Sequence, residues 1–190
     1  MAFSSIMEEL GSSAPDFQLP NTNPDAGPDV VSLGDFSVMP ALLVAFVCNH
    51  CPYVIHIRDC FSDFARSYAD RGLGIVAISA NDISTHPGDG PKKMAAEALA
   101  HNFSHPYLYD ESQEVAQAYG AVCTPDFFGF NKKLELHYRG RIDSGVMNTG
   151  DKEKIKRELF YAMEMITLTN KGPTKQTNSF GCSIKWKNNE

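Results

Sequence analysis

Clusters of basic residues and long apolar runs are both missing from this sequence. Its 190 residues include 17 Lys or Arg and 23 Asp or Glu, a formal net charge of −6, and acidic side chains interrupt its most basic stretch, residues 152–157. Because nucleic-acid binding draws on clustered Lys and Arg, we expect no nucleic-acid partner. The longest apolar stretch, residues 39–47, contains Pro40 and falls far short of the roughly 18 residues that a spanning helix requires, so we expect no membrane span.

The sequence also lacks the features of an export signal. Residues 1–13 contain Glu8 and Glu9, without the charged start and apolar stretch of a signal peptide. We therefore expect a cytoplasmic location, where thiols remain reduced. Five cysteines in such a chain favour catalytic or metal-binding roles over structural disulfides.

The order of apolar segments indicates an α/β fold. Residues 41–47 form an unbroken apolar run of strand length, which is typical of a strand covered on both faces. Apolar side chains then recur at helical spacing from Pro52 until Gly72, and residues 73–79 form a second apolar strand. This order of strand, helix and strand predicts a right-handed parallel crossover.

The length and 43% hydrophobic composition are sufficient for one domain with a substantial core. We predict a single domain over residues 1–190, with a frayed lead-in at 1–13 and a polar tail at 171–190 that packs back through Ile184 and Trp186. The other predicted elements are a strand at 30–33, helices at 91–102, 112–119 (capped by Ser112) and 151–169, and a hairpin of strands at 127–130 and 134–138.

Two cysteines, Cys48 and Cys51, follow the first buried strand in a C-x-x-C arrangement. Cys48 lies where the strand ends and a helix is about to begin, so we expect its sulfur to meet the free N–H groups of that helix. Cysteines placed in this way have pKa values of roughly 3.5 to 7.5, and the thiolate is the attacking species. Cys51, one turn further on, is close enough to form the disulfide. We expect an imidazolium at His50 to favour the Cys48 thiolate further and to make the disulfide more oxidising than that of thioredoxin.

The same cysteine pair is also suited to half of a zinc site. A complete site needs two more ligands, and the sequence has no second C-x-x-C pair and no H-x-x-x-H pair. His50 and His56 would complete a set with Cys48 and Cys51 only if the helix brought all four together. We therefore predict no metal. We also predict no organic cofactor, because no glycine-rich phosphate loop follows a strand.

Three motifs resemble, in the same order, those of the peroxiredoxin and thioredoxin-like superfamily. They are Ala14-Pro15-Asp16-Phe17, the segment from Cys48 to Pro52, and Val122-Cys123-Thr124-Pro125, which looks like the cis-proline segment of that fold. The chain looks most like the peroxiredoxin-like (AhpC/TSA-type) small redoxins that carry C-N-x-C-P-Y and a C-terminal G-C-S-I-K-W, here residues 181–186.

This resemblance implies a thioredoxin-like fold, with a central mixed sheet flanked by helices. It implies Cys48 as the nucleophile and Cys51 as the resolving thiol. It also implies a cis bond between Thr124 and Pro125, beside the two cysteines, where Pro125 receives an extended substrate backbone.

The departures from the resemblance bear on the reaction. Peroxiredoxins resemble one another in a P-x-x-x-T-x-x-C motif whose cysteine aligns with Cys51. Val44 occupies the proline position and Cys48 the threonine position, which removes a hydroxyl that helps to bind peroxide. Thioredoxin has a buried acid in the strand before its cysteines, and residues 41–47 contain none, so His50 is our candidate for proton transfer.

The remaining cysteines have alternative interpretations. Cys123 is either a third redox partner or a small buried hydrophobic residue. Cys182 is either an additional resolving thiol or an anchor for the tail, and we favour the anchor. Cys60 lies about half a helical turn out of phase with the active pair, so we expect it in the core.

The leading hypothesis is a thiol-disulfide oxidoreductase with an antioxidant or redox-homeostasis role. Its expected partners are a protein or small-molecule thiol or disulfide substrate and a reductant such as thioredoxin or glutathione. The alternatives are a thiol-dependent peroxidase and, outside the enzymes, a zinc-binding or redox-sensing module.

Overall fold

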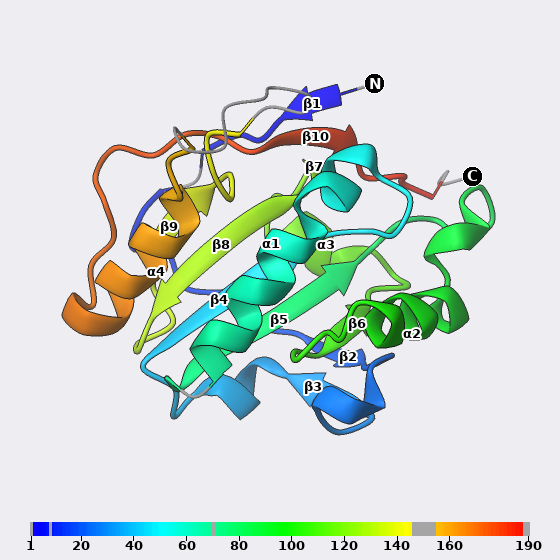
Figure 1. The fold of residues 1–190 in the computed structure, drawn as a ribbon, viewed down its shortest axis with the longest axis horizontal. Helices are drawn as coiled ribbons and strands as arrows, with labels where there is room; N and C mark the ends of the chain where they lie inside the picture. The colour runs from blue at the N-terminus through cyan, green and yellow to red at the C-terminus, as the bar shows by residue number, and fades with distance from the viewer. Residues whose placement is uncertain (1, 8, 70, 146–154, 188–190) are drawn as a thin grey trace.

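A five-stranded sheet forms the centre of the molecule (Figure 1). The computed structural model describes residues 2–7, 9–69, 71–145 and 155–187. The first two pairs of neighbouring strands are parallel and the last two are antiparallel, so the sheet is mixed, as predicted. The strands are, in spatial order, β6 (Tyr107–Tyr109), β5 (Leu73–Ser79), β4 (Ala41–Phe46), β8 (Asp126–Asn131) and β9 (Leu136–Gly140).

Helix α1 (Pro52–Ala69) connects β4 to the parallel strand β5. Gly72 follows the helix with φ at +75°, in the left-handed region that favours glycine, and leads the chain into β5. The predicted order of strand, helix and parallel strand is confirmed.

Side chains of β4 alternate between two apolar clusters, one on each face of the sheet. Leu43 and Ala45 belong to the cluster that α1, α2 and α4 cover, whereas Val44 and Phe46 belong to the one that α3 and the N-terminal segment complete. Burial on both faces explains the unbroken apolar run of this strand. The other helices are α2 (Pro91–Ala100), α3 (Glu114–Ala118), α4 (Glu158–Thr169) and the short 3-10 helices η1 (Pro24–Ala26), η2 (Leu33–Phe36) and η3 (Pro87–Asp89). Among the described residues, no helix combines the length and apolar character needed to cross a membrane.

Helix α4 begins later than predicted. The helix expected over 151–169 starts at Glu158, and residues 151–154 lie outside the described residues. Backbone groups just before Glu158 bond to the preceding loop instead of continuing the helix. The Lys156 N–H donates to Ser144 Oγ at 2.8 Å, and the Ser144 N–H donates to the Lys156 carbonyl at 3.0 Å.

Helix α3 also has a different start. It begins at Glu114 and not at Ser112. Asp110 Oδ2 accepts the Ala116 N–H at 2.8 Å, whereas Ser112 Oγ accepts the Glu114 N–H at a longer 3.3 Å. Asp110 therefore provides the closer bond to the helix start, and the prediction that Ser112 caps the helix was wrong.

The two ends of the chain meet in a second, smaller sheet. Strand β10 (Phe180–Ser183) pairs antiparallel with β1 (Ala2–Ser4) on one side and with β7 (Cys123–Thr124) on the other. Residues 2–4 are therefore paired, contrary to the expected frayed lead-in. In the tail, Ile184 is buried as predicted, but Trp186 is 38% exposed. A further pair of short strands, β2 (Gln18–Pro20) and β3 (Val30–Ser32), lies before β4 in the chain and confirms the strand expected at 30–33.

Candidate active site

The two cysteines of the C-x-x-C unit lie between the end of β4 and the start of α1. Cys51 immediately precedes Pro52, the first helical residue, and its carbonyl accepts the Ile55 N–H at 2.9 Å. Cys51 therefore occupies the N-cap position, where a side chain can accept the free N–H groups of the first turn. Cys48 lies three residues earlier, outside the helix.

Both sulfurs meet at Thr124. Cys48 Sγ lies 3.3 Å from Thr124 Oγ1, and Cys51 Sγ lies 3.2 Å from the Thr124 carbonyl oxygen, to which its thiol form donates. The bond between Thr124 and Pro125 is cis, as the resemblance implied. The structure thus brings together Cys48, Cys51, Thr124 and Pro125 from two distant parts of the chain. Both thiols are free, and they are only 1% and 0% exposed.

The pKa values of the two thiols move in opposite directions. A hydrogen bond from Cys48 lowers the pKa of Cys51 to about 4, with further hydrogen bonds from the Cys182 thiol and from the backbone N–H groups of Val54 and Cys182. The pKa of Cys48 lies well above its usual value because of the hydrogen bond to Cys51, burial and the charge of Asp89. These shifts favour the thiolate on Cys51, at the N-cap of α1, whereas the sequence analysis placed it on Cys48.

Asp89 holds His50 beside the cysteines. Asp89 Oδ1 accepts the backbone N–H groups of Asn49 (2.8 Å) and His50 (3.2 Å), and Oδ2 lies 2.5 Å from His50 Nδ1. Asn81 Nδ2 also donates to Oδ2 at 2.9 Å. With Nδ1 directed at the carboxylate, Nε2 is the ring nitrogen free to exchange a proton. The His86 ring stacks on His50, and burial and the nearby His50 lower the pKa of His86.

Asp89 is a site residue that sequence reasoning missed. It belongs to η3, in the loop that follows β5. The carboxyl ends of the parallel strands β4 and β5 lie at the same edge of the sheet, so this loop meets the one that carries Cys48. An acidic residue soon after the second strand was therefore an available signal.

One group of three side chains has the spacing of a metal site. Possible ligand atoms of Cys48, His50 and Asp89 lie within 4.8 Å of one another, and the group does not include Cys51 or His56. Both oxygens of Asp89 already accept hydrogen bonds, which favours an orienting role over metal ligation. The set of four ligands considered from the sequence is thus not brought together among the described residues.

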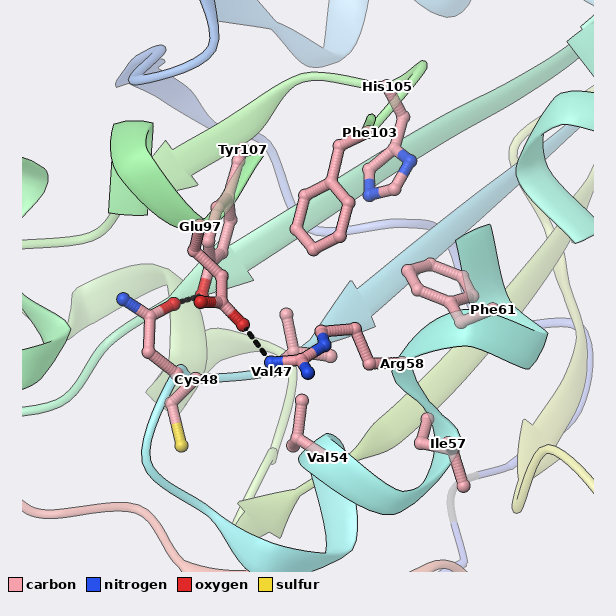
Figure 2. A pocket seen from close by; sticks show the side chains of 11 residues that line it. Val47, Cys48, Val54, Ile57, Arg58, Phe61, Glu97, Phe103, His105 and Tyr107 are labelled. Carbon is pink, nitrogen blue, oxygen red and sulfur yellow. Dashed lines mark hydrogen bonds and ion pairs between the residues drawn. The ribbon is translucent and has the colours of Figure 1, made fainter. Parts of the chain in front are cut away.

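A small cavity lies behind Cys48 (Figure 2). Its volume of about 20 Å³ has room for roughly one water molecule, so it cannot hold an organic substrate. Tyr107 closes one side by donating from its hydroxyl to Asn49 Oδ1 at 2.9 Å. His105 lines the same cavity, and burial lowers its pKa to about 4, so its ring is neutral at pH 7.

A larger hollow of about 500 Å³ lies beside Pro125. Side chains from the first turns of α1 and from the C-terminal tail share its lining. We call it the Pro125 hollow, and its main residues are Tyr53, His56, Pro125, Arg141 and Phe180. Its size suits several side chains of an extended peptide or one small molecule.

The other three cysteines differ in their burial and in their contacts with Cys48 and Cys51. Cys123 is fully buried, and burial raises its pKa, as expected of a small hydrophobic residue. Cys60 is partly buried and packs against the core from α1, as predicted, and it lies nine residues beyond Cys51 along the chain. Cys182 hydrogen-bonds to Cys51, and burial and that bond raise its pKa to about 11.

Comparison with known proteins gives a consistent family. The model of the AhpC/TSA family matches residues 10–140. An uncharacterized conserved protein from Geobacillus kaustophilus is 39% identical, with a TM-score of 0.92 over 100% of this chain and 98% of that one. The hypothetical protein SMc02350 from Sinorhizobium meliloti 1021 is 40% identical, with a TM-score of 0.90 over 97% and 98% of the two chains.

A more distant structure extends the likeness in fold. The thioredoxin domain of the thiol-disulfide oxidoreductase BVU-2223 from Bacteroides vulgatus is 17% identical, with a TM-score of 0.57 over 70% of this chain and 89% of that one. The fold of the present chain is thioredoxin-like, as the resemblance implied.

Proposed function

The chain belongs to the AhpC/TSA family, and on that premise we propose that it is a thiol-disulfide oxidoreductase whose Cys48–Cys51 pair alternates between dithiol and disulfide. The observation that carries this proposal is the meeting of both sulfurs at Thr124, beside the cis peptide bond and at the start of α1. A helix start stabilises a thiolate, which is the attacking species in disulfide exchange.

Cys51 is the attacking sulfur in this proposal. At neutral pH it is a thiolate, since its pKa is about 4. It attacks one sulfur of a substrate disulfide, a mixed disulfide forms at Cys51, and the other substrate sulfur leaves as a thiolate that takes a proton from water. The roles implied by the resemblance, with Cys48 as nucleophile, are thereby exchanged.

Cys48 then resolves the mixed disulfide. Its pKa is high, so it needs a base, and side-chain atoms of Cys48 and His50 lie within 4.8 Å of each other, a separation that one bridging water molecule can span for proton transfer. Asp89 orients the His50 ring and stabilises the imidazolium that forms. The Cys48 sulfur attacks Cys51, the Cys48–Cys51 disulfide closes, and the second substrate sulfur leaves with the proton from His50.

The proposed substrates are disulfides of proteins or small molecules. The Pro125 hollow provides space for a substrate next to the cis peptide bond. A reductant such as thioredoxin or glutathione would return the pair to the dithiol. We propose a cytoplasmic role in redox homeostasis, where reduced partners of this kind are available.

Insulin reduction with dithiothreitol as electron donor tests the proposal. We expect turnover by the wild-type chain and a large loss in both Cys48→Ser and Cys51→Ser. Cys60→Ser is the matched control and should keep full activity, because Cys60 lies nine residues beyond Cys51 and about half a helical turn out of phase with it. Turnover that survives both active-site substitutions would rule out this mechanism.

Peroxide reduction is a second candidate function. It is favoured by the low pKa of Cys51, the cysteine that aligns with that of the peroxiredoxin motif. Cys51 would be oxidised to a sulfenic acid as the peroxide O–O bond breaks, and Cys48 would condense with it, releasing water. Stopped-flow oxidation by hydrogen peroxide should then be much faster than that of free cysteine and absent in Cys51→Ser. A rate equal to that of free cysteine would remove this candidate.

A further inference from the structure

Strand β10 is the central strand of the small sheet, between β1 and β7 (Figure 1), and β7 leads directly into the cis peptide bond. In its antiparallel pairing with β7, Cys182 lies opposite Thr124 and Ser183 lies opposite Cys123. An extended substrate that docked on β7 by adding a strand would need the same backbone groups. The tail of the chain therefore lies where such a substrate segment would lie.

Close packing holds β10 in this position. A Cβ atom at Gly181 would lie 1.9 Å from the Thr124 carbonyl oxygen, so only glycine allows this approach. Next to it, the Phe180 ring packs edge to face against Tyr53, with 5.5 Å between ring centroids. Tyr53 belongs to the first turn of α1, so the tail is attached to both elements that form the site.

The register of β10 brings Cys182 to Cys51. Cys51 Sγ lies 3.2 Å from the carbonyl of Thr124, and Thr124 is the residue that pairs with Cys182. The thiol and the backbone N–H of Cys182 both hydrogen-bond to Cys51. Cys51 is thus in contact with two thiols, those of Cys48 and Cys182.

The three thiols differ in access. Cys48 and Cys51 are 1% and 0% exposed, whereas Cys182 is partly exposed. A partner can therefore approach Cys182 while β10 stays in place, whereas it reaches the sulfurs of Cys48 and Cys51 only when β10 moves aside.

From this geometry we propose that Cys182 is a third redox thiol, which stands in for a substrate cysteine and transfers the disulfide between Cys51 and an external dithiol. The proposal rests on the proposed function. In the oxidised site the Cys182 thiolate attacks the Cys51 sulfur. The Cys51–Cys182 bond forms, the Cys48–Cys51 bond breaks, and the Cys48 thiolate takes up the proton that Cys182 lost.

The exchange between the two disulfides is redox-neutral. A dithiol reductant then attacks the accessible Cys182 sulfur and forms a mixed disulfide, while Cys51 leaves as a thiolate. The second thiol of the reductant closes its own disulfide and releases Cys182. Two electrons and one proton pass from the reductant to the chain, in which Cys51 ends as a thiolate, and the second proton of the reductant goes to water.

Disulfide mapping in Cys48→Ser tests this assignment. In this variant, oxidised glutathione converts Cys51 to a glutathione mixed disulfide, which Cys182 can displace to form Cys51–Cys182 and release glutathione. Trypsin separates the two cysteines, because no Lys or Arg precedes Arg58 and because Lys175 and Lys185 flank the Cys182 peptide. We expect peptide 1–58 joined to peptide 176–185 in about ten-fold excess over the glutathione adduct of Cys51, because the second thiol is intramolecular.

Matched variants make the result decisive. Cys48→Ser/Cys60→Ser should give the same linked peptides, and Cys48→Ser/Cys182→Ser should accumulate the adduct. Accumulation of the adduct in Cys48→Ser, with Cys182 still a free thiol, would overturn the proposal. Cys182→Ser tests the proposed function separately, since the Cys48–Cys51 disulfide should still form in it. If the Cys48–Cys51 disulfide did not form in Cys182→Ser, that result would count against the proposed dithiol function itself.

Discussion

At the scale of single residues, the position of Cys51 at the helix start decides where the negative charge lies. The Cys48 thiol and the Val54 N–H are among the donors that lower the pKa of Cys51 to about 4. We expect the reduced chain to hold one thiolate from about pH 4 upward. Ultraviolet thiolate absorbance, followed against pH in the wild type and in Cys51→Ser, measures this. A midpoint near pH 9 in the wild type would contradict the assignment.

The same pKa shift makes the stability of the reduced chain depend on pH. Cys51 titrates near 9 when unfolded and near 4 when folded, so between these values the unfolded chain binds the extra proton. The free energy of unfolding should therefore rise with pH across this window, and the gain should be lost as the pH falls through about 4. Denaturant unfolding of reduced wild type and Cys51→Ser at several pH values isolates the contribution of Cys51.

His50 offers a second prediction at this scale. If its ring takes the Cys48 proton, His50→Gln should lower the rate of exchange with a small disulfide at neutral pH by roughly 10²-fold, the lower part of the range for general base catalysis. His137→Gln, on the distant strand β9, is the control. Equal rates in the two variants would show that His50 does not transfer the proton.

Sequence reasoning predicted which residues lie together at the start of α1 better than it predicted the pKa of each thiol. The cis bond before Pro125 and the meeting of Cys48 with Cys51 were both predicted. The sequence placed the thiolate on Cys48, whereas the pKa shifts favour Cys51, and that choice depends on whether the helix begins before or after Cys51. Asp89 was missed because its contact with His50 joins residues that are distant in the sequence.

At the scale of elements, the position of β10 depends on one glycine. In Gly181→Ala the new Cβ would lie 1.9 Å from the Thr124 carbonyl oxygen, so β10 must move away from β7. We expect faster alkylation of Cys182 and of Cys51 in the reduced protein. The single tryptophan, Trp186, lies just beyond β10 and should report the movement by a change in fluorescence.

A matched glycine substitution controls this experiment. Gly34→Ala in η2 places its Cβ at an ordinary 3.7 Å from the nearest atom, so it should change neither alkylation nor fluorescence. If Gly181→Ala behaves like Gly34→Ala, the tail does not shield the thiols.

Elements with strong local patterns were predicted well, and elements that depend on distant partners were not. Strands β4 and β5 and helix α1 follow from apolar runs and helical periodicity. Strand β1 could not be predicted, because residues 2–4 become a strand only by pairing with β10 at the other end of the chain. The late start of α4 likewise arises from hydrogen bonds to the loop at Ser144.

At the scale of the whole molecule, stability and chemistry reside in different parts of the sheet. Phe130 is 1% exposed and pairs with Leu42, four positions along β4 from the site end. Phe130→Ala should lower the free energy of unfolding by about 3–5 kcal/mol, because it leaves a cavity against Tyr119. It should leave the reduction potential of the Cys48–Cys51 pair unchanged.

Denaturant unfolding and redox titration of the same samples check this separation. Leu99→Ala is the control, since Leu99 is 71% exposed on α2 and should change stability by less than about 0.5 kcal/mol. A large shift in potential in Phe130→Ala would mean that core packing and the site are coupled.

The central claim is that Cys48 and Cys51 form one redox couple at the start of α1. The most direct test is a redox titration of the wild-type chain in buffers of defined potential, with alkylation and mass analysis of peptide 1–58 at each step. The account predicts a two-electron transition: as the buffer becomes more oxidising, peptide 1–58 loses two hydrogen atoms when the disulfide forms. The midpoint potential should lie above that of thioredoxin, which is roughly −270 mV. Two thiols that remain open to alkylation at every potential would contradict it.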